Sequence, residues 1–170
     1  GCARGQDAVI TIVGYPKDVE EIYLGADGIL ANLTEGAYTA DMTTSSPALA
    51  ERIYAEAKKR GIHALDAPVT GGDMGARNAT LNILVGGDED AFKAMQPVFA
   101  AMGKNIVYEG AAGAGQKTKA ANQIAIAGTL AGACEAFAYA RAAGLDPEKV
   151  FSSISGGAAA SFQMSNMIRK

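Results

Sequence analysis

The stretch AVITIVGYPKDVEEIYL, residues 8–24, contains the pattern that decides the fold class. Its first six residues are mostly apolar and rich in β-branched side chains, as in a strand covered on both faces of a parallel sheet. After a glycine and a proline, apolar Val19, Ile22 and Tyr23 recur at helical spacing. The stretch therefore predicts a buried strand followed by a helix.

The same alternation continues along the chain. Further strands are predicted at 36–41, 63–69, 80–85 and 105–108, with helices at 47–60 and 88–102. Pro47 opens the first of these two helices, at a position where its missing N–H has no partner to lose. Short connections between alternating strands and helices favour a parallel, doubly wound α/β sheet.

A longer helix follows the last predicted strand. From about Gln116 to Ala143 the chain is rich in alanine and has no proline, which predicts a helix of about 28 residues, roughly 42 Å long. Such a helix exceeds an ordinary crossover and indicates the spine of a separate helical domain. Within it, Gly128 and Gly132 predict close helix packing, and Cys134 is expected in a core. Asp146 and the proline after it predict the start of the next helix.

Composition excludes several classes of protein. The 170 residues are 49% hydrophobic and 19% charged, which suits a globular protein with a core. The net charge is -3 with scattered basic residues, so we expect no nucleic acid or anionic membrane as partner. The longest apolar run, 124–134, is well short of the roughly 20 residues that span a bilayer. Two distant cysteines predict no metal site and a reducing, cytoplasmic setting.

The segment GAGQKTKAANQ, residues 113–123, concentrates polar groups in an apolar part of the chain. If Gln116 opens the helix, then Lys119, Asn122 and Gln123 share one face. The positive end of the helix should lower the pKa of Lys119, making it a usable proton donor and acceptor near neutral pH. On spacing alone, a solvated lysine with two amides at a helix start remains the commoner explanation.

Two further polar segments follow predicted strands. DAPVTGG, residues 66–72, ends in paired glycines whose backbone N–H groups can approach a carboxylate closely. DMTTSSP, residues 41–47, places four hydroxyl side chains in the same kind of position before a helix. Ligands of open α/β sheets bind at the carboxyl ends of strands, so both segments are candidate binding loops. A plain turn and an N-cap cluster are the respective alternatives.

Taken together, these three motifs resemble the β-hydroxyacid dehydrogenase family, which includes 3-hydroxyisobutyrate dehydrogenase, tartronate semialdehyde reductase and, more distantly, 6-phosphogluconate dehydrogenase. The segments NILVGGDEDAF (82–92) and MGKNIVYEG (102–110) support the resemblance, which covers essentially the whole chain. It implies a partial Rossmann-type doubly wound sheet followed by the start of an all-α domain with a long spine helix. The implied bounds are 1–112 for the later part of the dinucleotide-binding domain and 113–170 for the helical domain.

The resemblance implies an oxidoreductase that transfers a hydride between a small β-hydroxy acid and NAD or NADP. The substrate would be of the 3-hydroxyisobutyrate or tartronate semialdehyde/glycerate type. Relatives assemble through their helical domains, which implies a homo-oligomer, a dimer or tetramer. The family's GxGxxG motif for the pyrophosphate does not occur in these 170 residues. We therefore expect that the sequence is a piece of a longer chain.

The same resemblance implies a role for each motif residue. Lys119 is the catalytic acid/base; Thr70, Gly71, Gly72, Asn122 and Gln123 bind substrate; Val13, Gly14 and Thr44 border the cofactor. Two departures stand out, since relatives commonly carry Leu-Pro in place of Val13-Gly14 and serine in place of Thr70. A non-catalytic metabolite-binding or chromatin-associated protein on the same fold is the alternative, and the presence of the lysine counts against it.

Overall fold

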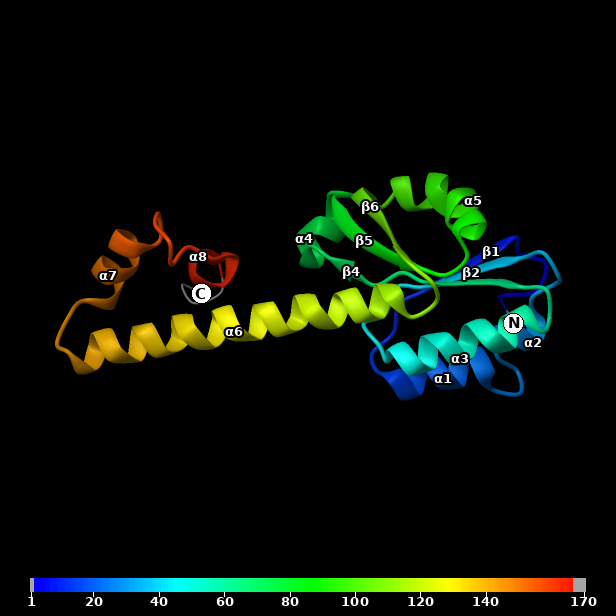
Figure 1. The fold of residues 1–170 in the computed structure, drawn as a ribbon, viewed down its shortest axis with the longest axis horizontal. Coiled ribbons are helices and arrows are strands. Elements are labelled where there is room, and N and C mark those ends of the chain that lie inside the picture. The colour runs from blue at the N-terminus through cyan, green and yellow to red at the C-terminus, as the bar shows by residue number, and fades with distance from the viewer. Residues whose placement is uncertain (1, 167–170) are drawn as a thin grey trace. The chain divides into compact units, whose positions relative to one another are not determined.

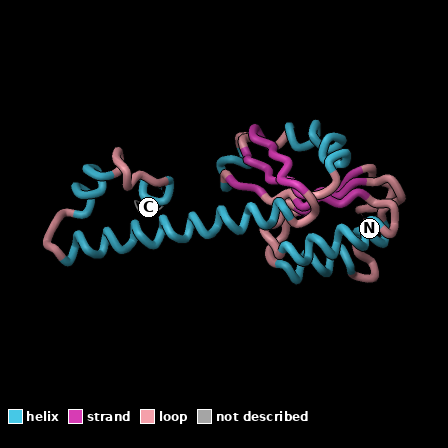
Figure 2. The backbone as a smooth tube through the Cα atoms, viewed as in Figure 1, coloured by secondary structure: helices cyan, strands magenta, loops and turns pink. Residues whose placement is uncertain are grey.

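The computed structural model describes residues 2–166. The chain forms two compact units, the first ending at Lys119 and the second beginning at Ala120. Figure 2 shows strands in the first unit and helices in the second. The first unit contains β1 (Ala8–Thr11), α1 (Pro16–Leu24), α2 (Ile29–Asn32), β2 (Tyr38–Asp41), α3 (Pro47–Lys58), β3 (His63–Asp66), β4 (Val69–Thr70), α4 (Gly72–Arg77), β5 (Leu81–Gly86), α5 (Glu89–Ala100), β6 (Gly103–Gly110) and the start of α6 (Ala114–Ala142).

The six strands form one sheet with the order β1-β2-β3-β5-β4, and β6 pairs with β5. Strands β1, β2 and β3 are parallel, and their register places Asp41 beside Asp66. Strand β5 runs antiparallel to β3 and β4, so the sheet is mixed where a wholly parallel one was expected. The connection 71–80 is shorter than the dozen or so residues that a parallel crossover needs.

Pro68 divides the strand predicted at 63–69 into β3 and β4. Proline has no N–H to donate to a neighbouring strand, so it interrupts the ladder. Its carbonyl still accepts a hydrogen bond from the N–H of Leu84, at 3.0 Å. The chain therefore ends one strand at Asp66, bends, and pairs again with β5 at Val69 and Thr70.

Helices cover both faces of the sheet in Figure 1, with α1 and α3 on one side and α5 on the other. On β3, Ala64 packs in the core under α1 and α3, whereas Leu65 packs in the core under α5. Strand β1 departs from the prediction of a fully buried strand. It pairs only with β2 among the described residues, and Ile10 is 37% exposed.

The second unit contains the rest of α6 with α7 (Pro147–Ile154) and α8 (Phe162–Asn166). Its small core is formed by Ala133, Phe151 and Met164, and the ring of Phe137 lies 5.6 Å from that of Phe151. The carboxylate of Asp146 accepts a hydrogen bond from the N–H of Glu148 at 3.0 Å, which confirms the predicted helix start.

Helix α6 has 29 residues, close to the predicted length, but it begins two residues earlier than predicted. Two other expectations for this helix were wrong within the described chain. Cys134 is exposed, and a Cβ added at Gly128 or Gly132 would meet no atom within 4 Å. Between residues 2 and 166, no helix combines the length and the apolar character that crossing a membrane requires.

Candidate active site

Gln116 joins two of the three sequence motifs at the carboxyl end of β2. Its Nε2 donates to the carbonyl oxygen of Thr43 at 2.7 Å, and its Oε1 accepts from the N–H of Ser45 at 2.9 Å. The side chain is only 1% exposed, so both ends of the amide must find partners inside the protein. The turn that leads to Lys119 is thereby attached to the loop that contains Thr44.

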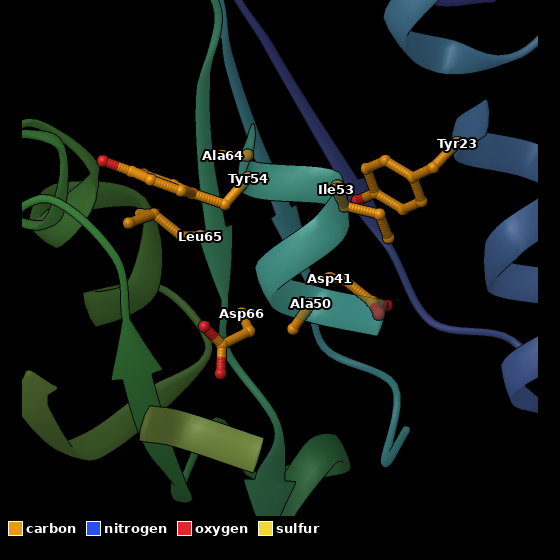
Figure 3. A pocket seen from close by; sticks show the side chains of 8 residues that line it. All are labelled: Tyr23, Asp41, Ala50, Ile53, Tyr54, Ala64, Leu65 and Asp66. Carbon is orange, nitrogen blue, oxygen red and sulfur yellow. The ribbon is translucent and has the colours of Figure 1, made fainter. Parts of the chain in front are cut away.

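Asp66 attaches the third motif to the same helix. Its Oδ1 accepts from the N–H of Gly113 at 2.7 Å, and its Oδ2 accepts from the N–H of Gln116 at 2.8 Å. In Figure 3 its carboxylate points toward the first turn of α6, where a negative charge favours the unpaired N–H groups. Burial raises the pKa of Asp66, and the two N–H donors oppose part of that rise. Sequence reasoning missed this contact and that of Gln116.

The two glycines ahead of Gln116 make this close approach possible. Gly113 has a φ of +84°, in the region that favours glycine. A Cβ on Gly115 would lie 2.3 Å from the carbonyl oxygen of Leu84 and 2.8 Å from that of Asp66. Residue 115 therefore has to be glycine for α6 to begin against the backbones of β3 and β5.

A second polar network lies at the ends of β1 and β2. The N–H of Val13 donates to Oγ1 of Thr43 at 2.9 Å, which brings the end of the first strand to the same loop. Asp41 accepts from the N–H of Thr43 at 3.1 Å and from the hydroxyl of Thr11 at 3.2 Å. Burial raises the pKa of Asp41 and also that of Tyr23, whose hydroxyl is 2.9 Å from that of Thr11.

Lys119 follows Gln116 by one helical turn and is 7% exposed. Its ammonium has no hydrogen bond or ion pair with any described residue, and the nitrogen itself keeps some contact with solvent although most of the side chain is buried. Burial lowers its pKa, which is the expected direction, although the expectation rested on the positive end of the helix. Lys117, by contrast, is exposed and forms an ion pair with Glu51 at 2.7 Å. Of these two lysines, only Lys119 has the burial that makes proton exchange near neutral pH easier.

The remaining predicted substrate-binding residues have no hydrogen bonds to the Gln116 network among the residues that the structure describes. Thr70 is half-buried on β4, while Gly71 and Gly72 are exposed and have φ values of +127° and +63°. No hydrogen bond within residues 2–166 joins these three to the Gln116 network. Asn122 and Gln123 belong to the second unit, where the Nδ2 of Asn122 donates to the Oε1 of Gln123 at 3.1 Å.

The loop at 43–46 contains an unsatisfied polar group near the carboxyl end of β2. Oγ of Ser45 is buried without a hydrogen-bond partner, a state found for no other side-chain oxygen or nitrogen in the described part of the chain. Thr44 beside it is exposed, as is Gly14, and Val13 is half-buried. An unpaired buried hydroxyl next to exposed backbone fits a polar ligand at this end of the sheet. Sequence reasoning chose Thr44 here and missed Ser45.

Two of the pockets in the first unit are lined by no predicted site residue. The smaller one lies between α3 and the sheet (Figure 3) and has a volume of about 10 Å³, enough for about one water molecule. Figure 3 labels all eight residues around it. The other is a cleft of about 260 Å³ among α1, α2 and α3. It is lined by Tyr23, Leu24, Gly25, Leu30, Ala31, Arg52, Glu56 and Arg60.

The fold and this site define a Rossmann-type NAD(P)-binding protein with an attached helical unit. Residues 1–110 match the family model for the NAD-binding domain of 6-phosphogluconate dehydrogenase. Residues 113–170 match that for the NAD-binding domain of NADP-dependent 3-hydroxyisobutyrate dehydrogenase. The chain belongs to the β-hydroxyacid dehydrogenase family.

Individual relatives agree with this assignment. The chain is 56% identical to an uncharacterized oxidoreductase, YkwC, of Bacillus subtilis, covering 97% of this chain and 57% of that protein. It is 47% identical to the probable 3-hydroxyisobutyrate dehydrogenase-like 3 of Arabidopsis thaliana, covering 95% and 51%. A solved structure of 3-hydroxyisobutyrate dehydrogenase from Mycobacterium tuberculosis with L-serine has a TM-score of 0.84 and 34% identity, covering 97% and 55%. The chain thus spans about half the length of the curated relatives it matches.

Proposed function

We propose that the protein is an oxidoreductase that interconverts a small β-hydroxy acid and its carbonyl form with NAD or NADP, using Lys119 as general acid/base. The observation that supports this most is the state of the lysine. Lys119 is buried, its pKa is lowered, and it has no partner among the described residues. It also lies one turn beyond Gln116, which joins the motif loops by hydrogen bonds.

The proposed role of Lys119 is proton transfer at the substrate hydroxyl. In oxidation the neutral amine takes the hydroxyl proton, and in reduction the ammonium returns it to the carbonyl oxygen. NAD or NADP, when bound, accepts the hydride from the carbon that bears the hydroxyl, or supplies it in the reverse direction. Because burial disfavours the ammonium, Lys119 exchanges its proton more readily near neutral pH than an exposed lysine does.

The other motif residues orient the two reactants in this proposal. The hydroxyl of Thr70 and the backbone of Gly71 and Gly72 hold the substrate carboxylate, because glycines leave the N–H groups accessible. Asn122 and Gln123 bind the substrate from the next turn of α6. Val13, Gly14 and Thr44 border the nicotinamide end of the cofactor, and Ser45 offers its unpaired hydroxyl there.

The class of substrate is supported by a relative. The Mycobacterium tuberculosis structure is described with L-serine, which carries a hydroxyl on its β-carbon. We propose a substrate of the 3-hydroxyisobutyrate or tartronate semialdehyde/glycerate type. A panel of 3-hydroxyisobutyrate, glycerate, 3-hydroxypropionate, γ-hydroxybutyrate and L-serine, each with NAD and NADP, identifies it.

Substitution of Lys119 tests the mechanism in the full-length protein. Lys119→Ala should lower kcat by about two to four orders of magnitude, because it removes the acid/base group. Lys117→Ala is the matched control; its ion pair is exposed and of little energetic weight, so kcat should stay within about twofold. A loss below tenfold in Lys119→Ala contradicts the role. Absence of turnover with every acid and both cofactors favours a non-catalytic binding protein.

We further propose that the protein is a homo-oligomer, a dimer or tetramer, assembled through its helical unit. Several large apolar side chains of that unit are exposed, with Ile124 at 74%, Tyr139 at 73% and Phe162 at 69%. Exposed apolar surface of this kind is common at interfaces between protein chains. Light scattering after size-exclusion chromatography should give a dimer or tetramer, and Ile124→Lys should weaken it. A monomer at micromolar concentration would argue against this assembly.

A further inference from the structure

We propose that Asp66 and Gln116 are positioning residues for Lys119, because together they hold the helical turn from which its side chain extends. The inference depends on the acid/base role proposed for Lys119. Neither residue is assigned a contact with substrate or cofactor. They act by fixing where the lysine lies relative to the binding loops.

The side chain of Gln116 donates one hydrogen bond and accepts another. Thr43 presents a carbonyl oxygen and Ser45 presents an N–H, and the amide satisfies both from a single side chain. A carboxamide offers a donor and an acceptor on adjacent atoms at neutral pH, which matches these two backbone groups. Methionine would leave both backbone groups unpaired, and an ionised glutamate would keep only the bond to Ser45.

Asp66 binds the backbone of the same helical turn from the end of β3, the strand next to β2. Its two oxygens accept from the N–H groups of Gly113 and Gln116, which lie at either end of the first turn of α6. Asparagine would retain one acceptor and turn an NH₂ group toward the other N–H. Burial is the main cause that raises the pKa of Asp66, and the nearby charge of Asp41 adds to that rise.

Lys119 lies three residues beyond Gln116, about 4.5 Å along the helix axis. Its side chain has no hydrogen bond or ion pair of its own with the described residues, so its position depends on packing and on where the helix backbone lies. The contacts of Lys117 with Glu51 and of Thr118 with Glu109 join α6 to α3 and β6, but Lys117 and Glu51 are exposed. The buried contacts of Asp66 and Gln116 are therefore the ones that place the amine.

A purely structural anchor would change stability alone, whereas a positioning residue also changes the surroundings of the lysine. The experiment uses Gln116→Met and Asp66→Asn in the full-length protein. Gln96→Met, on the exposed face of α5, is the matched control for loss of a glutamine amide. Competitive acetylation with acetic anhydride across pH, followed by mass spectrometry, measures the titration of individual lysines without requiring turnover.

In the unaltered protein, Lys119 should become reactive at a pH below the ordinary range of a lysine, because burial lowers its pKa. In Gln116→Met and Asp66→Asn its profile should move to higher pH, because a displaced side chain is less buried. Gln96→Met should leave the profile of Lys119 unchanged. If both site variants are folded and Lys119 titrates as in the unaltered protein, the positioning role is wrong.

Kinetics provide the second readout. We expect kcat to fall by about 10- to 100-fold in Gln116→Met, as for a misplacement near 1 Å. If Gln116→Met does not fold, Gln116→Glu keeps the bond to Ser45 and is measured in the same way. If the unaltered protein turns over no β-hydroxy acid, the proposed function fails. The acetylation profiles still decide the positioning role in that case.

Discussion

Replacing Gly115 by alanine tests whether α6 begins against the sheet. We expect this change to lower the stability of the protein, whereas Gly→Ala in an exposed helix usually raises it. In an exposed helix interior, Gly→Ala stabilises by roughly 1 kcal/mol. At Gly115 the new methyl group would lie 2.3 Å from the carbonyl oxygen of Leu84, where ordinary contacts begin at 3.4 Å. The start of α6 must therefore withdraw from the sheet by about 1 Å.

That withdrawal lengthens the two hydrogen bonds that Asp66 accepts, which are 2.7 and 2.8 Å long. Hydrogen bonds to a charged group contribute about 1.5–3 kcal/mol each, so losing both costs about 3–6 kcal/mol. Subtracting the roughly 1 kcal/mol gain in helix propensity leaves a net destabilisation of about 2–5 kcal/mol.

Urea denaturation followed by far-UV circular dichroism measures this free energy of unfolding in the full-length protein. Gly128→Ala is the matched control on the same helix, since a Cβ there meets no atom within 4 Å. It should be neutral or stabilise by up to about 1 kcal/mol. If Gly115→Ala also proves neutral or stabilising, α6 does not begin against β3 and β5, and the argument for a positioned lysine fails with it.

Two further predictions concern charge and helix capping. Lys119→Met should raise stability near neutral pH, because it removes an ammonium whose burial lowers the lysine pKa. The lysine binds its proton more tightly in the unfolded chain than in the folded protein, so the stability gain of Lys119→Met should shrink as pH rises toward 10.5, the ordinary pKa of lysine. Thermal melts of both proteins between pH 7 and pH 10 measure this trend. A stability difference that stays constant over this range contradicts the prediction. Asp146→Ala should destabilise α7 by about 1 kcal/mol, seen as roughly fivefold faster amide exchange in that helix. Unchanged exchange there would mean that the cap contributes nothing.

Features of the fold that depend on short-range physics were predictable from the sequence. The strand and helix of residues 8–24, the start of α3 at Pro47 and the cap at Asp146 all reflect spacing or local hydrogen bonding. The direction of the pKa shift of Lys119 was also foreseen, although burial is its cause. The antiparallel course of β5 was missed, because it depends on whether the connection 71–80 is long enough for a crossover.

The sequence by itself singled out the candidate site residues: the three motifs, Lys119 among them, and the glycines that precede it. Only the tertiary structure decided how the motifs meet, since the bonds of Asp66 to α6 span 47 and 50 residues and those of Gln116 to the loop at Thr43 span 73 and 71. Periodicity and capping act over a few residues, so no local pattern specifies such partners. They are selected when the sheet brings the ends of β2 and β3 together and a buried carboxylate and amide have to satisfy their hydrogen bonds there.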